Sequence, residues 1–283
     1  MSKKRLLLIG CGDLPQRLVA KLDPETWQID GLRRSDIQIP GIHISTGDAK
    51  NPESIKPLIA KKPDQIIITL TPGSRGAEAY TNTYLKSAEN VAQLAQELAP
   101  SAHLLFVSST SVFGQNNAEI VDESSQTSPA RETAQILLAA EEKIAASENP
   151  SSIVRFSGIY GPGRTRLIEK VASKNYATAE AANWTNRIHS EDCAAVLGHL
   201  ITHKHISVNG AGVLIATDHQ SVLNLDVEEW IASQLKVSYS ITKDKSVQAK
   251  GKRCSNQKLV NTGFSFQYEN YQMGYAEMLK QML

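Results

Sequence analysis

The sequence predicts an α/β protein built on a doubly wound parallel sheet, and two observations carry that prediction. First, a short apolar run at residues 6–9 leads directly into a glycine turn and then into a segment with apolar residues at helical spacing. Second, short apolar runs alternate with helical segments as far as residue 157. Such alternation is typical of parallel strands joined by right-handed crossover helices.

The elements follow in a regular order. The expected strands are the apolar runs at residues 6–9, 27–32, 42–45, 65–70, 103–107 and 152–156. The expected helices between them begin near residues 14, 52, 77 and 129, and the third continues to residue 98. A polar loop is expected at 115–128. After residue 157 the alternation weakens, with strands expected at 212–216 and 237–242 and a helix at 226–235. We therefore expect one domain at 1–157 and a smaller lobe packed on it at 158–283.

Composition narrows the possible functions. The 283 residues carry a formal net charge of +1, which gives no electrostatic reason to expect nucleic acid or an anionic membrane as a partner. The first apolar run is too short for a signal peptide, and no run approaches the roughly 20 residues of a membrane span. The three cysteines are scattered without metal-ligand spacing. We expect a soluble, cytoplasmic protein.

The glycine turn is the first candidate binding element. Gly10 and Gly12 lie between the first strand and a helix that begins with Asp13 and Leu14. This order is typical of Rossmann-type domains, where glycine lets a pyrophosphate approach the backbone and the positive end of the helix dipole. The usual third glycine is replaced by Pro15.

The end of the second strand indicates which dinucleotide binds. An acidic residue is usual there when the ribose 2′-hydroxyl is free, but this chain has Arg33, Arg34 and Ser35. Two guanidinium groups and a hydroxyl suit a 2′-phosphate, which favours NADP while leaving NAD possible. The alternative is a solvated basic turn. Asp30 lies about 20 residues past Gly10 and could be nominated as the ribose carboxylate, but it falls too early, within the strand.

Other strand ends complete the expected cofactor site, because ligands of open α/β sheets bind outside the carboxyl ends of the strands. Asp48 follows the third strand and could accept a hydrogen bond from an adenine amino group, or could simply be a turn residue. Leu70 and Thr71 end the fourth strand, and Ser108 ends the fifth.

Several motifs occur in a familiar order. They are Gly10-Cys11-Gly12, Gly47-Asp48, Ser108-Ser109-Thr110-Ser111-Val112-Phe113-Gly114, Arg155-Phe156-Ser157-Gly158-Ile159-Tyr160-Gly161-Pro162-Gly163 and Asn186-Arg187-Ile188-His189-Ser190-Glu191-Asp192. Together they resemble the extended and atypical short-chain dehydrogenases/reductases, the NAD(P)-dependent epimerase/dehydratase-like group. The resemblance spans residues 6 to about 200, and it implies a Rossmann-type fold and a nicotinamide dinucleotide.

The resemblance also implies a proton relay that this chain lacks. The family uses a Ser or Thr after the fifth strand, a place held here by Ser109, with a Tyr-x-x-x-Lys pair on the next helix. With Glu141 taken as the acid that commonly follows, the tyrosine position falls on Thr133 and the lysine position on Leu137. A threonine hydroxyl is too weak an acid to replace tyrosine, and leucine lowers no pKa.

The resemblance places Gly158, Tyr160 and Arg187 on the substrate side. Arg187 could hold an anionic substrate group or pin the smaller lobe through an ion pair. His189 could supply the missing acid, or it could be a structural hydrogen-bonding residue.

Two further sequence features have plain alternatives. A cluster of histidines at positions 199, 203 and 205 lacks the ligands that would complete a zinc site, so we expect no metal. The aromatic and aliphatic stripe of the 77–98 helix is core or a homodimer contact, since family members often dimerise through this region.

Two functions remain open from the sequence. One is an NADP-preferring, epimerase-like oxidoreductase with a small-molecule substrate that the sequence does not name. The other is a catalytically silent dinucleotide-binding sensor or scaffold protein. A third interpretation, in which the pocket binds no dinucleotide at all, is the least favoured.

Overall fold

The chain folds as two compact units. The computed structural model describes residues 2–178, 182–202, 212–241 and 248–282. Unit 1 comprises Met1–Val112, Thr127–Arg155 and Ala194–Leu214, and unit 2 comprises Phe113–Gln126, Phe156–Cys193 and Ile215–Leu283. Each unit is therefore assembled from three separate segments of the chain. The expected division at residue 157 stays a prediction.

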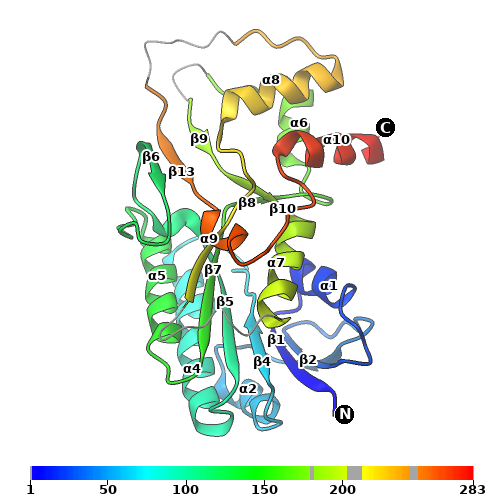
Figure 1. Cartoon of the computed structure of the whole chain (residues 1–283), viewed down its shortest axis with the longest axis vertical. Coiled ribbons are helices and arrows are strands. Elements are labelled where there is room, and N and C mark those ends of the chain that lie inside the picture. The colour runs from blue at the N-terminus through cyan, green and yellow to red at the C-terminus, as the bar shows by residue number, and fades with distance from the viewer. Residues whose placement is uncertain (1, 179–181, 203–211, 242–247, 283) are drawn as a thin grey trace. The chain divides into compact units, whose positions relative to one another are not determined.

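The predicted parallel α/β sheet is confirmed. Seven strands lie in the order β11-β7-β5-β4-β1-β2-β3 (Figure 1). Their bounds are β1 Lys4–Ile9, β2 Trp27–Arg33, β3 His43–Thr46, β4 Gln65–Ile68, β5 His103–Ser109, β7 Ser151–Phe156 and β11 Gly212–Ala216. β1 lies between β2 and β4 and is parallel to both. Its four last residues are fully buried, as expected of a strand with both faces covered.

Helices cover both faces of this sheet. They are α1 Asp13–Val19, α2 Pro52–Ile59, α3 Ala77–Tyr80, α4 Lys86–Leu98, α5 Glu132–Ala145 and α7 Ser190–Thr202. Figure 1 shows α4 and α5 on one side of the strands and α1 and α7 on the other. α2 begins as the sequence predicts: the Asn51 side chain accepts a hydrogen bond from the Glu53 backbone N–H, and Pro52 occupies the first helical position.

The long helix predicted at 77–98 is present, with an unexpected π-turn, η1, at Thr81–Leu85. Tyr80 ends α3 and Tyr84 lies within the π-turn, and their rings are in contact with centroids 5.2 Å apart. The Tyr84 ring packs edge-on against Phe106 with ring centroids 6.5 Å apart.

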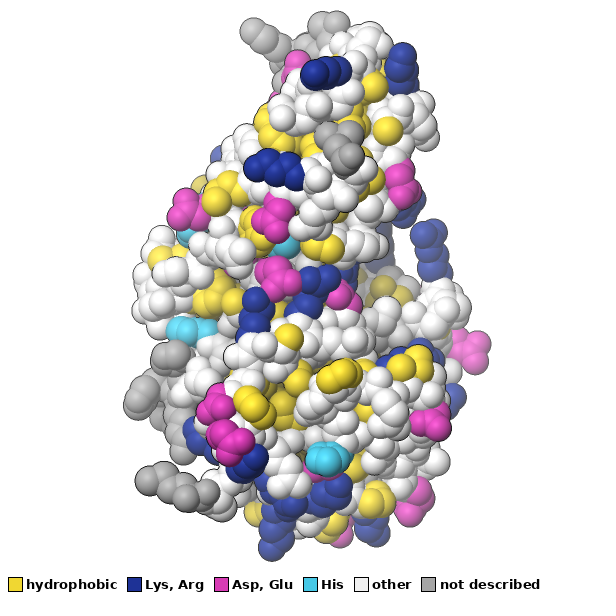
Figure 2. All heavy atoms as spheres, turned by 90° about the vertical axis from the view of Figure 1, so that its right-hand side faces the viewer, with side chains coloured by type: hydrophobic (Ala, Val, Ile, Leu, Met, Phe, Trp, Pro, Cys, Tyr) yellow, Lys and Arg dark blue, Asp and Glu magenta, His cyan; other side chains and the backbone are white. Residues whose placement is uncertain are grey.

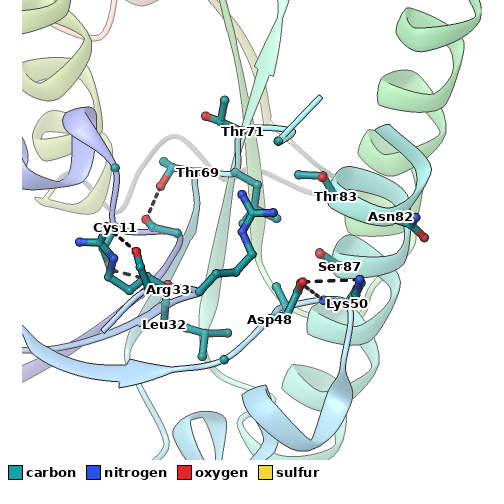
Figure 3. Close-up of a pocket in the computed structure, with 18 of the residues that line it drawn as sticks. Cys11, Leu32, Arg33, Asp48, Lys50, Thr69, Thr71, Asn82, Thr83 and Ser87 are labelled. Atoms are coloured by element: carbon teal, nitrogen blue, oxygen red, sulfur yellow. Dashed lines mark hydrogen bonds and ion pairs between the residues drawn. The ribbon is translucent and has the colours of Figure 1, made fainter. Parts of the chain in front are cut away.

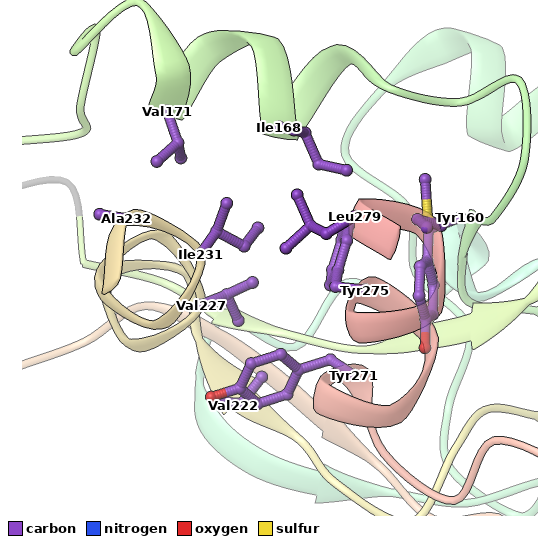
Figure 4. Close-up of a cluster of buried hydrophobic side chains, with 11 residues drawn as sticks. Tyr160, Ile168, Val171, Val222, Val227, Ile231, Ala232, Tyr271, Tyr275 and Leu279 are labelled. Atoms are coloured by element: carbon purple, nitrogen blue, oxygen red, sulfur yellow. The ribbon is translucent and has the colours of Figure 1, made fainter. Parts of the chain in front are cut away.

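Unit 2 is built from short elements around a separate core. Its elements are β6 Asn117–Val121, β8 Gly158–Tyr160, α6 Arg166–Ala172, β9 Trp184–Thr185, β10 Arg187–His189, β12 Val222–Leu223, α8 Asn224–Leu235, β13 Gly251–Cys254, α9 Gln257–Val260 and α10 Tyr271–Met282. Figure 4 shows apolar side chains of α6, α8 and α10 packed together, with Tyr160 stacked on Tyr275 at 4.6 Å between ring centroids.

Two local predictions in unit 2 were wrong. The polar loop expected at 115–128 contains β6, which pairs in parallel with β13 more than 120 residues later. The strand expected at 237–242 is absent from the described residues 237–241, and Thr242 lies outside them. Tyr239 instead packs its ring on Tyr176, at 4.7 Å between centroids. In both places the conformation depends on contacts with a distant segment of the chain. A local sequence pattern cannot predict such contacts.

The surface matches the near-neutral charge. On the face drawn in Figure 2, Lys and Arg side chains are interspersed with Asp and Glu. None of the described helices is long and apolar enough to cross a membrane.

Candidate functional site

A cavity of about 370 Å³ opens in unit 1 at the carboxyl ends of β1, β2 and β4 (Figure 3). Eight of the predicted cofactor residues line it, namely Gly10, Gly12, Arg33, Arg34, Ser35, Asp48, Leu70 and Thr71. Strand ends that are far apart in sequence meet there because β1 lies between β2 and β4. The location is the one that open α/β sheets use for ligands.

Glycine is present at positions 10 and 12 of the turn for different physical reasons. Gly10 has a φ of +92°, and a Cβ there would lie 2.3 Å from the Thr69 carbonyl oxygen, so the fold itself demands glycine. Gly12 has an ordinary φ of −81°, and a Cβ there would meet no protein atom within 4 Å. The fold leaves the space beside Gly12 open.

The rim at the end of β2 is cationic. Arg33 is half-buried and its Nη2 donates to the Ser35 hydroxyl at 3.0 Å, while Arg34 is exposed. Burial raises the pKa of the neighbouring Cys11 thiol to about 11, and the Arg33 charge only partly offsets it. The thiol therefore stays protonated and unreactive at neutral pH.

The two acids near the cavity are already engaged. Asp30 lies within β2 outside the cavity lining, and its carboxylate forms an ion pair of 2.6 Å with Lys61. Asp48 lines the cavity while its Oδ1 accepts a hydrogen bond of 3.1 Å from the Lys50 backbone N–H. The second oxygen of Asp48 lies 3.7 Å from the Lys50 ammonium, so this residue has a turn role whatever it binds.

Sequence reasoning missed the helical wall of the cavity. Asn82, Thr83 and Ser87 line it from the π-turn and the start of α4. In Figure 3, Thr83 and Ser87 lie along the helix that faces Asp48 and Lys50. The spacing of four residues from Thr83 to Ser87 was the available signal, because it parallels the spacing of the tyrosines on the same helix.

Three predicted cofactor residues lie outside the described lining. Asp13 forms an i, i+4 ion pair of 2.7 Å with Arg17, and Leu14 is buried in the core. The Ser108 hydroxyl donates to the Glu141 carboxylate. Its hydroxyl is therefore committed within the core.

Glu141 is the centre of a buried polar network. Its carboxylate accepts from Nε and Nη2 of Arg155 at 2.6–3.2 Å. Glu141, Arg155 and Ser108 are all almost fully buried. A bidentate Arg–carboxylate pair of this kind joins α5 to β7 and β5. The network satisfies the charges that the helix brings into the core.

Thr133, Leu137 and Ser109, which the sequence analysis assigned to the relay positions, differ in burial. Leu137 is 3% exposed and belongs to the core, and Thr133 is half-buried on α5. Ser109 is half-buried, and its hydroxyl oxygen accepts a hydrogen bond of 3.1 Å from the Ser111 backbone N–H. That bond closes the turn after β5.

The predicted substrate-side residues gather in unit 2. Gly158 pairs with Arg187, and Tyr160 pairs with His189, in the register of β8 and β10. The buried Arg187 donates from Nη1 to the Thr185 hydroxyl at 2.9 Å, and its charge partly offsets the rise that burial causes in the pKa of Tyr275. Burial raises the pKa of Tyr160, so its hydroxyl stays protonated.

His189 occupies a packed position. It is 2% exposed, and its ring lies 3.8 Å from the Tyr268 ring and 5.2 Å from the Tyr160 ring between centroids. Its Nδ1 accepts from the Glu191 backbone N–H at 3.3 Å. The following Asp192 accepts from the backbone N–H groups of Gln267 and Tyr268, which fixes the segment before α10.

Asp218 is the buried acid that sequence reasoning missed. It follows β11, is 2% exposed, and its Oδ2 has no hydrogen-bond partner among the described residues. Burial raises its pKa to about 7, although the charge of Arg187 opposes that rise. No sequence motif indicates it, because its surroundings form only when the residues after β11 hydrogen-bond to Arg187 of β10.

The histidine cluster falls largely outside the described residues. His203 and His205 are not among them, and His199 lies on α7. Within the described residues, no group of three or more His, Cys, Asp or Glu side chains is arranged to hold a metal ion.

Comparison with known proteins identifies the family. The family model described as the RmlD substrate binding domain matches residues 4–283. The chain belongs to this family. A sequence search of curated proteins finds no match.

Solved structures agree with the fold. A candidate NAD-dependent epimerase/dehydratase from Methylobacillus flagellatus is 31% identical over 99% of both chains, with a TM-score of 0.85. MoeE5, solved with UDP-glucuronic acid and NAD, is 18% identical over 99% of this chain and 100% of its own, with a TM-score of 0.77. dTDP-glucose 4,6-dehydratase from Bacillus anthracis, solved with NAD, is 16% identical over 98% and 96% of the two chains, with a TM-score of 0.78. The expected resemblance to epimerase/dehydratase-like proteins is confirmed.

Proposed function

We propose that this chain binds a nicotinamide dinucleotide in the unit 1 cavity, prefers NADP to NAD, and acts as an epimerase/dehydratase-type oxidoreductase without the Tyr-x-x-x-Lys relay. One observation carries the proposal. The cavity joins a glycine corner with open space beside Gly12 to a rim of Arg33, Arg34 and Ser35. The NAD-bound structures of the same fold support a nicotinamide dinucleotide as the ligand, and the NADP preference rests on the cationic rim alone.

The residues of the cavity fit such a ligand. The missing side chain of Gly12 leaves room for a pyrophosphate close to the backbone. Guanidinium groups of the rim suit the oxygens of a 2′-phosphate, and Asp48, which lines the cavity, could accept a further hydrogen bond from the base beside its contacts with Lys50. Asp13 and Leu14 would act through the backbone of the corner, and Ser108 through its backbone, since its hydroxyl is engaged.

The bound nicotinamide would supply hydride transfer, and the chain would supply binding and proton handling. In our proposal Ser109 orients a substrate oxygen, while Thr133 and Leu137 leave no tyrosine–lysine pair to move its proton. His189 stays a candidate acid with low access, because two tyrosine rings enclose it.

The substrate-side residues would lie in unit 2, where Gly158, Tyr160 and Arg187 are grouped. MoeE5 with UDP-glucuronic acid supports a sugar nucleotide as the substrate class. A cytoplasmic location and a homodimer also stay predictions.

The direct test is titration of the purified chain with NADPH and with NADH, in which binding is measured by cofactor fluorescence. We expect NADPH to bind at least about tenfold more tightly, a difference of about 1.4 kcal/mol. Gly12→Ala should weaken both cofactors by about tenfold or more, because its methyl group enters the space of the pyrophosphate. Its thermal unfolding midpoint should change little, since the added Cβ meets no protein atom. Binding weaker than millimolar for both cofactors would reject the proposal, and tighter binding of NADH would reject the role of Arg33 and Arg34.

A second candidate is a catalytically silent dinucleotide-binding protein. The packing of Leu137 and the turn role of Ser109 favour it, because both relay positions have structural tasks instead. A panel of sugar nucleotides separates the two functions. Turnover of NADPH that falls severely in Ser109→Ala supports the enzyme, whereas tight cofactor binding without turnover of any panel member supports the silent protein.

A further inference from the structure

Arg253 of β13 is a half-buried cation that forms no ion pair with a carboxylate of the described residues. Its Nε donates to the Ala118 carbonyl oxygen at 2.8 Å, and its guanidinium carbon lies 5.3 Å from the centre of the Trp184 ring. Neither Nη1 nor Nη2 has a hydrogen-bond partner in the described part of the chain. Of the five N–H donors of an arginine, only one is therefore used here.

The backbone opposite Arg253 is shaped to hold its Nε. Gly251 pairs with Asn117 but Arg253 pairs with Ile120, so β6 carries one extra residue against β13. Ala118 lies in this bulge with a φ of +62°, a conformation that is unfavourable for a residue with a side chain. Its carbonyl oxygen is the one that accepts from Arg253. The bulge thus fixes the inner edge of the guanidinium.

The neighbouring segment fixes the plane of the guanidinium. The Trp184 backbone N–H donates to the Lys250 carbonyl oxygen at 2.7 Å, which joins β9 to the start of β13 (Figure 1). Gly251 permits this close approach, because a Cβ there would lie 2.6 Å from the Trp184 carbonyl oxygen. The indole of Trp184 then packs on the guanidinium as a cation–π pair. Arg253 is therefore held on two sides, with its terminal nitrogens left over.

Arg187, the other cation of unit 2 considered for an anionic substrate group, is held in a different way. It is 8% exposed, and its Nη1 donates to the Thr185 hydroxyl at 2.9 Å. Its charge also acts on the buried Asp218 carboxyl and opposes the rise in the pKa of that group. An anion bound by Arg187 would have to enter the core and compete with Asp218. Arg253 imposes neither requirement.

We propose that Arg253 is the anion-binding residue of unit 2 and that its two Nη groups hold a phosphate of a nucleoside diphosphate substrate, while Arg187 has an internal role. The inference rests on the sugar-nucleotide substrate class of the proposed function and names the residue that recognises it. Two phosphate oxygens match the planar fork of a guanidinium, and both hydrogen bonds are charge-assisted. Because the fork is already fixed by Ala118 and Trp184, little side-chain freedom is lost on binding.

The test is calorimetric titration with uridine diphosphate, with NADPH binding as the second measurement. We expect Arg253→Gln to weaken uridine diphosphate binding by about tenfold or more, because the charged fork is lost, and to change NADPH binding by less than about threefold. Arg253→Lys keeps the charge without the fork and should lose less than Arg253→Gln. Lys250→Gln is the matched control, since it removes an exposed charge from the same segment and should change either ligand by less than about threefold. Thermal unfolding checks that each variant folds.

The outcomes separate this inference from the proposed function. Equal losses in Arg253→Gln and Lys250→Gln, or equal losses of uridine diphosphate and NADPH in Arg253→Gln, would overturn the role of Arg253. A parent chain that binds NADPH but binds uridine diphosphate only above millimolar concentration would also overturn it, with the cofactor proposal still standing. If the parent binds neither NADPH nor NADH, yet loses uridine diphosphate only on Arg253→Gln, the role of Arg253 is supported and the cofactor proposal fails.

Discussion

The two units differ in how completely they satisfy their buried polar groups. Five buried side-chain oxygens have no hydrogen-bond partner among the described residues, and all five lie in unit 2: Gln115 Oε1, Ser157 Oγ, Ser190 Oγ, Asp218 Oδ2 and Gln272 Oε1. Buried polar atoms are normally paired with protein or with ordered water. Among the described residues, buried side-chain oxygens without a partner are therefore confined to unit 2.

One buried acid in each unit, Glu141 and Asp218, illustrates the same difference, although Glu228 of unit 2 is paired with Lys170. In unit 1, Glu141 is paired with Arg155 in a bidentate arrangement, and His103 is held neutral between Gln65 and Ser152. In unit 2, Asp218 is buried with one oxygen unpartnered, although Arg187 is close enough to affect its pKa. Substitution of Glu141 and of Asp218 should therefore change stability in opposite directions, and so should a change of pH acting on His103 and on Asp218.

Removing the centre of the unit 1 network should have the largest effect. Glu141→Ala leaves the Arg155 guanidinium buried without its carboxylate partner, so we expect a loss of about 3–5 kcal/mol in the free energy of unfolding. Urea unfolding at pH 7 measures it. Glu142→Ala is the matched control, since this exposed neighbour on α5 should cost less than about 0.5 kcal/mol. Equal effects of the two substitutions would remove the contrast between paired and unpaired buried charge.

Neutralising the unpaired acid of unit 2 should have the opposite sign. The pKa of Asp218 is raised to about 7 in the folded chain, mainly by burial, so the folded state binds more protons than the unfolded state between about pH 4 and 7. Stability from this group is therefore lost as the pH rises through that range. Asp218→Asn should stabilise the chain above pH 7, by about 2–4 kcal/mol.

The groups that face Asp218 limit this effect. Arg187 attracts the carboxylate, while Asp192 repels it and Tyr160 is held neutral beside it. Urea unfolding from pH 4 to 9 gives the comparison, with Asp226→Asn on α8 as a half-buried control. A variant that is less stable than the parent at pH 8 would mean that Asp218 is ionised and stabilised by Arg187.

Acid should weaken unit 1 through His103, with a smaller effect. Burial lowers the pKa of His103 to about 4, so the unfolded chain binds more protons between about pH 4 and 6.5. Stability is present above that range and is lost as the pH falls through it, by at most about 3 kcal/mol. His103→Gln should flatten the profile between pH 4 and 6.5 in the same unfolding experiment. A profile as steep as the parent's would assign the acid sensitivity to other groups.

Local sequence patterns predicted the strands of the parallel sheet and some of the residues that line the cavity. The apolar run at 65–70 predicted β4 because a strand covered on both faces has to be apolar throughout. Arg33, Arg34 and Ser35 were found because a strand end is itself a local feature, and strand ends of a parallel sheet share one edge. Thr83 and Ser87 were missed although they have helical spacing, because only the packing of this helix beside the ends of the strands turns that face toward the cavity.

The sequence alone determined the strand–turn–helix order at the start, the glycine at position 10 and the cationic end of β2. Each depends on residues that are neighbours in the chain, so backbone sterics and periodicity suffice to predict it. Only the tertiary structure decided that Ser108 serves Glu141, that Asp218 is buried beside Arg187, and that Arg253 donates to Ala118. Hydrogen bonds, burial and charge act over a few ångströms in space, and in these cases 33, 31 and 135 positions of sequence separate the partners.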